Sequence, residues 1–403
     1  MEDFHYKYGG STATRTMKCP GWAAMADDAK KNHGVVDSSS EFADEGTMLH
    51  NCCETLELEP DLTFDDLLER GMKYNNAVLT EDLLHSKVIP AMEALEELVS
   101  EYNLDVVEAE RQCNVSHNIG GTTDISGSSP DVIVTGDYKF GDGNMVFAED
   151  NNQLKFYSWN LIETGAFDHM ELFADTKVAL AIIQPSDRRD NTLDVWETTV
   201  EEIDKFGDEF IQFVEIAEAS KPGENLCSGG HCQYCPANGV NCTQREDEAA
   251  EALSMLLPKD KDDVEAHEEY DFERALELAS SLGNWITAVQ ARAHALLEGG
   301  FKVEGWKLVE KRATRKWVDE EKAGNYLQRK FGHKQVYTQK LLTPAKIDEL
   351  NKKEKLTLRL DKHVHKVSTG TTLARASDKR EALECHNTAE VLSQLGTEGD
   401  KEE

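Results

Sequence analysis

Between residues 106 and 219 the period of the apolar pattern changes repeatedly, and this alternation constrains the fold more than any other feature of the chain. Residues 107–110 alternate, as do residues 131–139, which add the β-branched side chains that strands favour. Residues 145–148 form a third short candidate strand. The continuous apolar run 178–183, closed by Pro185, is typical of a strand buried on both faces.

Helical patterns separate and flank these segments. Residues 60–102 read as helical with a break at Pro90. A second helix begins near Asn151, whose side chain suits an N-cap, and a long helix is predicted over 200–219. The order helix, three strands, helix, strand, helix predicts an α/β fold with a mixed central sheet flanked by helices.

Polar residues with metal-site chemistry follow this framework in order. Asp124 ends one strand candidate and Asp137 lies in the next, so a bent hairpin can bring both carboxylates to one cation. Carboxylate oxygens suit Mg²⁺, the kind of hard cation that phosphodiester hydrolysis needs. Lys139 lies two residues after Asp137 and therefore points to the same strand face, where an ammonium can position or deprotonate water and offset phosphate charge. His50, on the preceding helix, is a further candidate ligand.

Gln153 and Tyr157 lie four positions apart, on one face of the helix that follows. There they can hydrogen-bond the carboxylates or a DNA backbone. Each residue alone is common in ordinary proteins: a strand Asp-Tyr-Lys as a solvated edge, the histidine as a satisfied helix residue. The ordered set is much rarer than any member, and it favours a site.

The order GxxxH, GxxD, DxK, QxxxY resembles the RecB-like branch of the PD-(D/E)XK nucleases. Several segments are also similar to a phage and prophage family of RecB-like nucleases of largely uncharacterised function. Those segments run through nearly the whole chain: TRTMKCPGW (14–22), EFADEGTMLH (41–50), GTTDISG (121–127), DYKFGDGNMVFAEDNNQLKFYSWN (137–160), GWKLVEKRATRKWVDEE (305–321) and TLARASDKR (372–380).

The resemblance implies a restriction-endonuclease-like core in which His50, Asp124 and Asp137 are metal ligands and Lys139 is the catalytic lysine. It assigns Gln153 and Tyr157 to the RecB-type helix motif. Glu110, on the strand before Asp124, is a candidate auxiliary carboxylate. Thr123 stands where the motif's name has proline, a departure that RecB-like members often share.

Four cysteines lie close together in the segment 227–242, a spacing typical of metal or cluster ligation. In one interpretation Cys227, Cys232, Cys235 and Cys242 form a local zinc site. The resemblance implies another, in which Cys19 joins Cys232, Cys235 and Cys242 around a [4Fe–4S] cluster and Cys227 is spare. We expect the cluster ahead of zinc.

Charge is distributed unevenly along the 403 residues. Residues 1–300 carry a net charge of −39, residues 301–380 a net of +11, and residues 381–403 a net of −6. The resemblance implies a nuclease domain over 1–245, with a helical insertion at about 55–105 and the cysteines at 227–242. A helical connector (246–300), a mainly helical basic domain (301–388) and an acidic disordered tail (389–403) are expected to follow.

The basic segment is a candidate DNA surface because aromatic residues interleave its positive charges. The candidates are Arg312, Arg315, Lys316 and Trp317. An ordinary helical domain with an aromatic core and solvated lysines explains the same pattern equally well.

Together these features predict a Mg²⁺- or Mn²⁺-dependent deoxyribonuclease, with an exonuclease favoured by analogy, acting in phage or prophage DNA replication, recombination or degradation. The alternative is a non-catalytic DNA-binding recombination partner that keeps the nuclease fold; an acidic interaction protein with a zinc knuckle is less favoured.

DNA is the expected partner, with a phage single-strand-binding or recombination protein as a candidate. The chain has no run of about 18 apolar residues and no signal pattern at its start, so we expect no membrane span and a cytoplasmic location.

Overall fold

The computed structural model describes residues 6–35, 41–141, 144–186, 191–256, 272–310, 314–332, 363–367, 371–375 and 381–383, and the single residues 336, 344, 347 and 351. The chain divides into two compact units, residues 1–285 and 286–403, which are described separately. The domain boundaries expected from charge and composition remain predictions.

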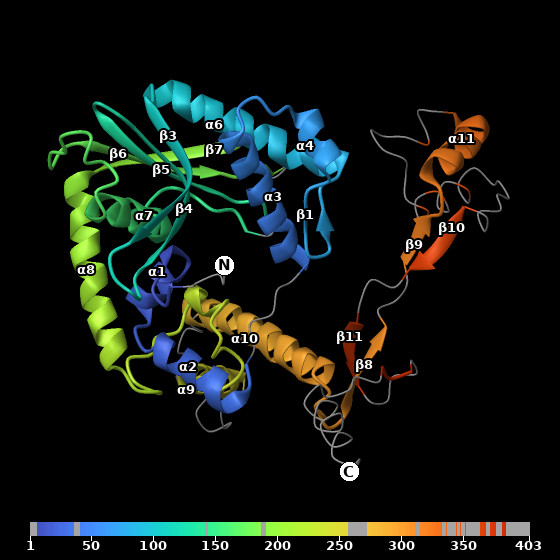
Figure 1. Cartoon of the computed structure of the whole chain (residues 1–403). Helices are drawn as coiled ribbons and strands as arrows, with labels where there is room; N and C mark the ends of the chain where they lie inside the picture. The colour runs from blue at the N-terminus through green and yellow to red at the C-terminus, as the bar shows by residue number, and fades with distance from the viewer. Residues whose placement is uncertain are drawn as a thin grey trace, which may run out of the picture. The chain divides into compact units, whose positions relative to one another are not determined.

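The first unit is built from helices and strands in an alternating order (Figure 1). Its helices are α1 (Gly10–Lys18), α2 (Trp22–His33), α3 (Glu41–Leu58), α4 (Phe64–Arg70), α5 (Glu81–Leu83), the π-helical η1 (Leu84–Val88), α6 (Ile89–Tyr102), α7 (Asn152–Glu163), α8 (Val200–Ala219), the 3₁₀ turn η2 (Gly230–Cys232), α9 (Thr243–Leu256) and α10 (Phe272–Glu298), which the boundary at residue 285 divides. Its strands are β1 (Lys73–Tyr74), β2 (Ala77–Val78), β3 (Val106–Asn114), β4 (Gly120–Ser129), β5 (Val132–Tyr138), β6 (Lys177–Ile183) and β7 (Leu193–Thr199).

A five-stranded mixed sheet in the order β3-β4-β5-β6-β7 forms the centre of this unit. Neighbouring strands are antiparallel except β5 and β6, which run parallel and are joined through α7. A parallel pair needs such a crossover, because a tight turn can only reverse the chain. The expected α/β class with a mixed sheet flanked by helices is confirmed.

Helices cover both faces of the sheet, and β6 shows why its sequence is apolar at every position. Val178, Leu180 and Ile182 pack with α1, α7 and α8, whereas Ala179 and Ala181 pack with Leu98 of α6. Successive side chains on a strand point to opposite faces, so a strand covered on both sides must be apolar throughout. Figure 1 shows α3 and α6 on one side of the sheet and α7 and α8 on the other.

Two predictions made from the sequence pattern are wrong. The hairpin β1–β2 interrupts the stretch 60–102, and Pro90 does not break the helix there: it occupies the first turn of α6, directly after the π-helical turn η1. Residues 145–148 are not a strand. Their backbone bonds side chains instead, since Val146 donates to Gln184 and Ala148 to Asp194.

The second unit holds more strand than expected. Its described elements are the rest of α10, β8 (Trp306–Glu310), β9 (Thr314–Trp317), α11 (Glu320–Phe331), β10 (Val364–Val367) and β11 (Thr371–Arg375). They form two antiparallel pairs, β8 with β11 and β9 with β10, so the described residues combine the expected helices with strands that were not expected. These pairings join segments far apart in the chain, which local periodicity cannot reveal. Among the described helices, none is long and apolar enough to cross a membrane.

Candidate metal centre

His50, Glu110 and Asp124 bring three potential metal ligands together. One donor atom from each lies within 4.8 Å of the other two, and in the described part of the chain no other three His, Cys, Asp or Glu residues meet in this way. His50 Nδ1 lies 3.3 Å from Asp124 Oδ2. α3 supplies the histidine, while β3 and β4 supply the two carboxylates.

Strand register places the two carboxylates opposite each other. Ala109 pairs with Ile125 and Arg111 with Thr123, so Glu110 on β3 lies opposite Asp124 on the neighbouring strand β4. Glu110 also has a φ of +47°, in the left-handed region that a glutamate adopts only at a cost. Like charges directly opposite on neighbouring strands destabilise a sheet. A cation between them would remove that repulsion, and the mixed oxygen and imidazole donors suit a divalent ion such as Mg²⁺ or Mn²⁺.

Asp137, Lys139 and Gln153 form a second, connected group at the end of β5. Gln153 Nε2 donates to Asp137 Oδ1 at 2.8 Å, and Lys139 Nζ donates to Gln153 Oε1 at 3.2 Å. Lys139 Nζ also lies 2.5 Å from Asp137 Oδ2. Lys139 lies one residue beyond β5, and its side chain meets that of Asp137 as expected. Asp137 lies outside the 4.8 Å group that contains Glu110.

Helix α7 carries Gln153 and Tyr157 toward these groups. Asn151 caps its first turn by accepting hydrogen bonds from the amides of Gln153 and Leu154, as the sequence predicted. Tyr157 is 8% exposed, and its ring packs against the backbone of Gly10 and Gly121. A Cβ at Gly10 would lie 2.5 Å from Tyr157 Cζ, so only glycine leaves room for this ring.

The charges of the two groups act on one another. Burial opposes protonation of His50, but Asp124 and Asp137 outweigh it and raise its pKa. Burial likewise opposes the charge of Lys139, yet Asp137 raises the lysine's pKa, so the ammonium form persists. Burial and the neighbouring Asp124 raise the pKa of Glu110 to about 7. Burial raises the pKa of Asp137 as well, against the pull of Lys139.

Glu57 joins the site, although no sequence pattern pointed to it. The Tyr138 hydroxyl donates to its Oε1 at 2.9 Å, while its buried Oε2 has no hydrogen-bond partner. Burial, with Asp124 and Glu110 nearby, raises the pKa of Glu57 to about 7. Its position seven residues after His50, two turns along α3, is the signal that could have identified it.

The cysteine segment meets the first helices of the chain. The Cys227 amide donates to the buried Cys19 sulfur at 3.3 Å, although the two are far apart in sequence. Burial raises the pKa of Cys19 to about 11, and Cys232, Cys235 and Cys242 add to the rise. Their sulfurs are not gathered as closely as the donor atoms of the acidic group, since no three of them lie mutually within 4.8 Å.

Backbone hydrogen bonds distinguish these sulfurs from ordinary buried thiols. Burial raises the pKa of three of these thiols, and hydrogen bonds from the backbone offset part of that rise. The donors are Cys227 for Cys19, Gly229 for Cys232, and Arg245 with Gln244 for Cys242. Cys227 differs, because it is exposed and directs its thiol to the Ser228 carbonyl. Cys19, Cys232 and Cys242 therefore share a feature that the exposed Cys227 does not show.

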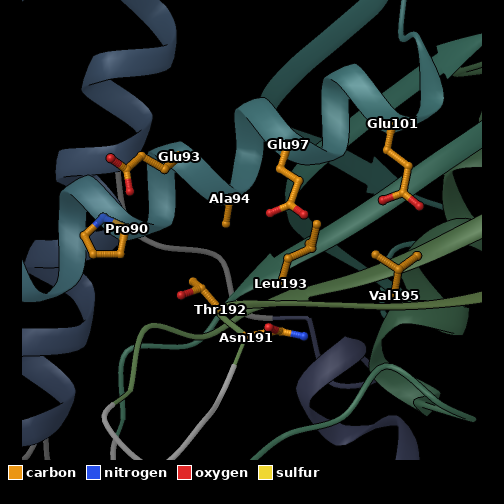
Figure 2. Close-up of a pocket in the computed structure, with 9 residues that line it drawn as sticks. All are labelled: Pro90, Glu93, Ala94, Glu97, Glu101, Asn191, Thr192, Leu193 and Val195. Carbon is orange, nitrogen blue, oxygen red and sulfur yellow. The ribbon is translucent and has the colours of Figure 1, made fainter.

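A separate groove of about 440 Å³ lies between α6 and β7 (Figure 2). Glu93, Glu97 and Glu101 line it from the helix, and Figure 2 shows Glu97 and Glu101 extending toward Leu193 and Val195 of the strand. A surface with this charge repels phosphate, so this groove does not extend the metal centre toward a nucleic acid.

The basic candidates fall in the second unit. Arg315 and Lys316 lie on β9, while Arg312 lies outside the described residues. Trp317 packs against a small core that contains Ala323 and Leu327. Their role at a DNA surface stays a prediction.

Comparison with solved structures gives weak likenesses. One, described as "Crystal structure of SSO0001", is 12% identical over 54% of this chain and 93% of its own, with a TM-score of 0.21. Another, an alkaline exonuclease (LHK-Exo) from Laribacter hongkongensis, is 12% identical over 52% of this chain and 92% of its own, with a TM-score of 0.23. TM-scores this low establish no shared fold.

The family comparison covers nearly the whole chain. The model of the family described as "Protein of unknown function (DUF2800)" matches residues 5–381. The protein therefore belongs to the DUF2800 family.

Proposed function

We propose that the protein is a metal-dependent deoxyribonuclease with a PD-(D/E)XK-type core, and that it hydrolyses phosphodiester bonds. One observation carries the proposal: His50, Glu110 and Asp124 meet as a donor group beside the connected residues Asp137, Lys139 and Gln153. Hard-cation ligands next to a fixed ammonium are the parts that phosphodiester hydrolysis requires.

His50, Glu110 and Asp124 would hold a Mg²⁺ or Mn²⁺ ion, with Asp137 available beside them. When bound, such an ion stabilises the charge that develops on the phosphate oxygens and activates water. Lys139 has a distinct task. Because Asp137 raises its pKa, Lys139 Nζ keeps its proton and acts as a hydrogen-bond donor to water or phosphate rather than as a base.

Gln153 and Tyr157 position these groups. Gln153 bonds both Asp137 and Lys139, so it fixes the ammonium relative to the carboxylate. The Tyr157 ring fills the space between α1 and β4. The His50 and Lys139 side chains are 29% and 27% exposed, so this part of the centre is reachable from solvent.

We further propose that the enzyme is an exonuclease that acts on phage or prophage DNA in the cytoplasm, during replication, recombination or degradation. A single-strand-binding or recombination protein of the phage is its proposed partner. These assignments rest on the motif resemblance and on no contact within the molecule.

For the cysteines we propose that Cys19, Cys232, Cys235 and Cys242 bind a [4Fe–4S] cluster, with zinc as the alternative. The support is that backbone groups donate to three of these sulfurs, as they do around thiolate ligands. In a [4Fe–4S] cluster each cysteine thiolate binds a different iron, so the cysteine sulfurs need not lie as close together as the ligands of a single metal ion. Such a cluster would join helix α1 to the segment after α8 and so tie the two ends of the nuclease region.

The test compares matched linear and covalently closed circular DNA with Mg²⁺ or Mn²⁺. Wild type, Lys139→Ala and Asp124→Asn are assayed beside Lys205→Ala, which changes an exposed lysine on α8. We expect wild type and Lys205→Ala to degrade linear DNA only, and the two site variants to be inactive. Loss of both substrates would make the enzyme an endonuclease. DNA binding without cleavage above the Lys139→Ala background would instead favour a non-catalytic DNA-binding protein.

A further inference from the structure

The second unit contains an open groove with two exposed aromatic rings. Phe301 and Trp306 line a cavity of about 640 Å³ between the end of α10, β8 and the segment 381–383. The backbone amide of Leu383 donates to the Leu308 carbonyl at 2.9 Å and fixes that wall. Phe301 is 56% exposed and Trp306 40% exposed, which is unusual for rings of this size.

Other aromatic residues of the basic segment are engaged differently. Trp317 and Tyr326 pack with Leu327 and Val364 in a small core, and the Tyr326 ring stacks on His363 with centroids 5.2 Å apart. Those rings are partly buried in that core and expose less of their surface than Phe301 and Trp306 do. Of the described aromatic residues in this unit, Phe301 and Trp306 are therefore the ones suited to stacking.

Charge indicates what the groove accepts. Lys302 and Lys307 line it together with one acidic residue, Glu304. The surrounding segment 301–380 has a net charge of +11, in a chain that is otherwise strongly acidic. A polyanion with exposed planar groups matches both the rings and the charge.

We propose that this groove binds single-stranded DNA, with unpaired bases stacked on Phe301 and Trp306 and the backbone near Lys302 and Lys307. Base stacking on aromatic rings tolerates any sequence, so the groove holds a strand without selecting one. This inference deepens the proposed nuclease function, because it assigns the substrate's unpaired strand to a surface distinct from the metal centre.

The experiment measures fluorescence anisotropy of a labelled oligothymidylate with the full chain in EDTA, where cleavage cannot occur. We expect Phe301→Ala and Trp306→Ala to bind roughly tenfold more weakly each, and Trp306→Phe to keep most of the affinity. Phe173→Ala, which removes a 57% exposed ring from the first unit, is the matched control and should bind as wild type. Lys302→Gln should reduce the slope of log affinity against log salt by about 0.7.

Wild-type affinity in both alanine variants would overturn the proposal, as would equal competition by duplex DNA or preferential binding of an unstructured RNA. The two hypotheses fail separately. If wild type does not cleave DNA but the groove variants lose binding, the groove stands and the nuclease function falls. If cleavage depends on Lys139 while the groove variants bind normally, the nuclease function stands and the groove is wrong.

Discussion

Replacing Glu57 by glutamine should remove a pH-dependent cost that the metal-free protein carries. Glu57 lies near the end of α3 with its Oε2 buried, and its environment raises its pKa from 4.5 to about 7. An acid with a higher pKa in the folded state binds more protons folded than unfolded between those two values. The free energy of unfolding therefore falls as pH rises through this window, and it falls by about 3 kcal/mol for a shift of this size.

Glutamine keeps the acceptor for the Tyr138 hydroxyl and cannot ionise. Relative to wild type, Glu57→Gln should therefore gain up to about 3 kcal/mol on going from about pH 4 to about pH 8 in EDTA. Comparing the two pH values cancels any constant effect of the new amide. Glu110, with its own raised pKa, should leave part of the pH dependence in the variant.

The free energy of unfolding is measured in urea, with hydrogen exchange of the β4 and β5 amides as the probe. Those amides report on the sheet rather than on the second unit. Glu163→Gln, an exposed change at the end of α7, is the control and should follow the wild-type pH dependence. Parallel pH profiles for wild type and Glu57→Gln would refute the claim that burial among carboxylates penalises this side chain.

Three further changes test other parts of the molecule. Gly207→Ala should destabilise the protein by about 1–3 kcal/mol, measured by thermal unfolding, because its methyl group would overlap the Trp159 indole. Saturating Mn²⁺ should raise the melting temperature of wild type but not of Glu110→Gln, since a ligand stabilises only the state that binds it. Cys19→Ser should abolish visible absorbance and bound iron in protein isolated without oxygen, whereas Cys227→Ser should retain both; colourless wild-type protein with stoichiometric zinc would instead indicate the local zinc site.

Matched controls sharpen two of these tests. Gly283→Ala places a methyl group in open space on α10 and should stabilise by up to about 1 kcal/mol, as alanine does in helices. Glu101→Gln changes an exposed carboxylate in the groove beside β7 and should leave the Mn²⁺ response intact. A Mn²⁺ shift that survives in Glu110→Gln would place the ion elsewhere.

Local sequence determined much of the framework, because periodicity and capping act over a few residues. The run 178–183 is a strand buried on both faces, Asn151 caps α7, and residues 200–219 form one helix, as expected. The contact between Asp137 and Lys139 also follows from local geometry, since Lys139 directly follows β5 and side chains two residues apart in extended backbone share a face. The strand predicted at residues 145–148 is absent, because the amides of Val146 and Ala148 donate to the side chains of Gln184 and Asp194 and not to a neighbouring strand.

Tertiary structure decided what local pattern leaves open. The opposition of Glu110 and Asp124 depends on the register of β3 against β4, which no single segment encodes. Glu57 entered the site only because α3 packs beneath β5, and burial then changed its protonation. In the basic segment, sequence could not separate the rings that form a core from those that face solvent. Trp317 packs against a core and Trp306 faces solvent, because burial is a property of the assembled unit and not of the residue.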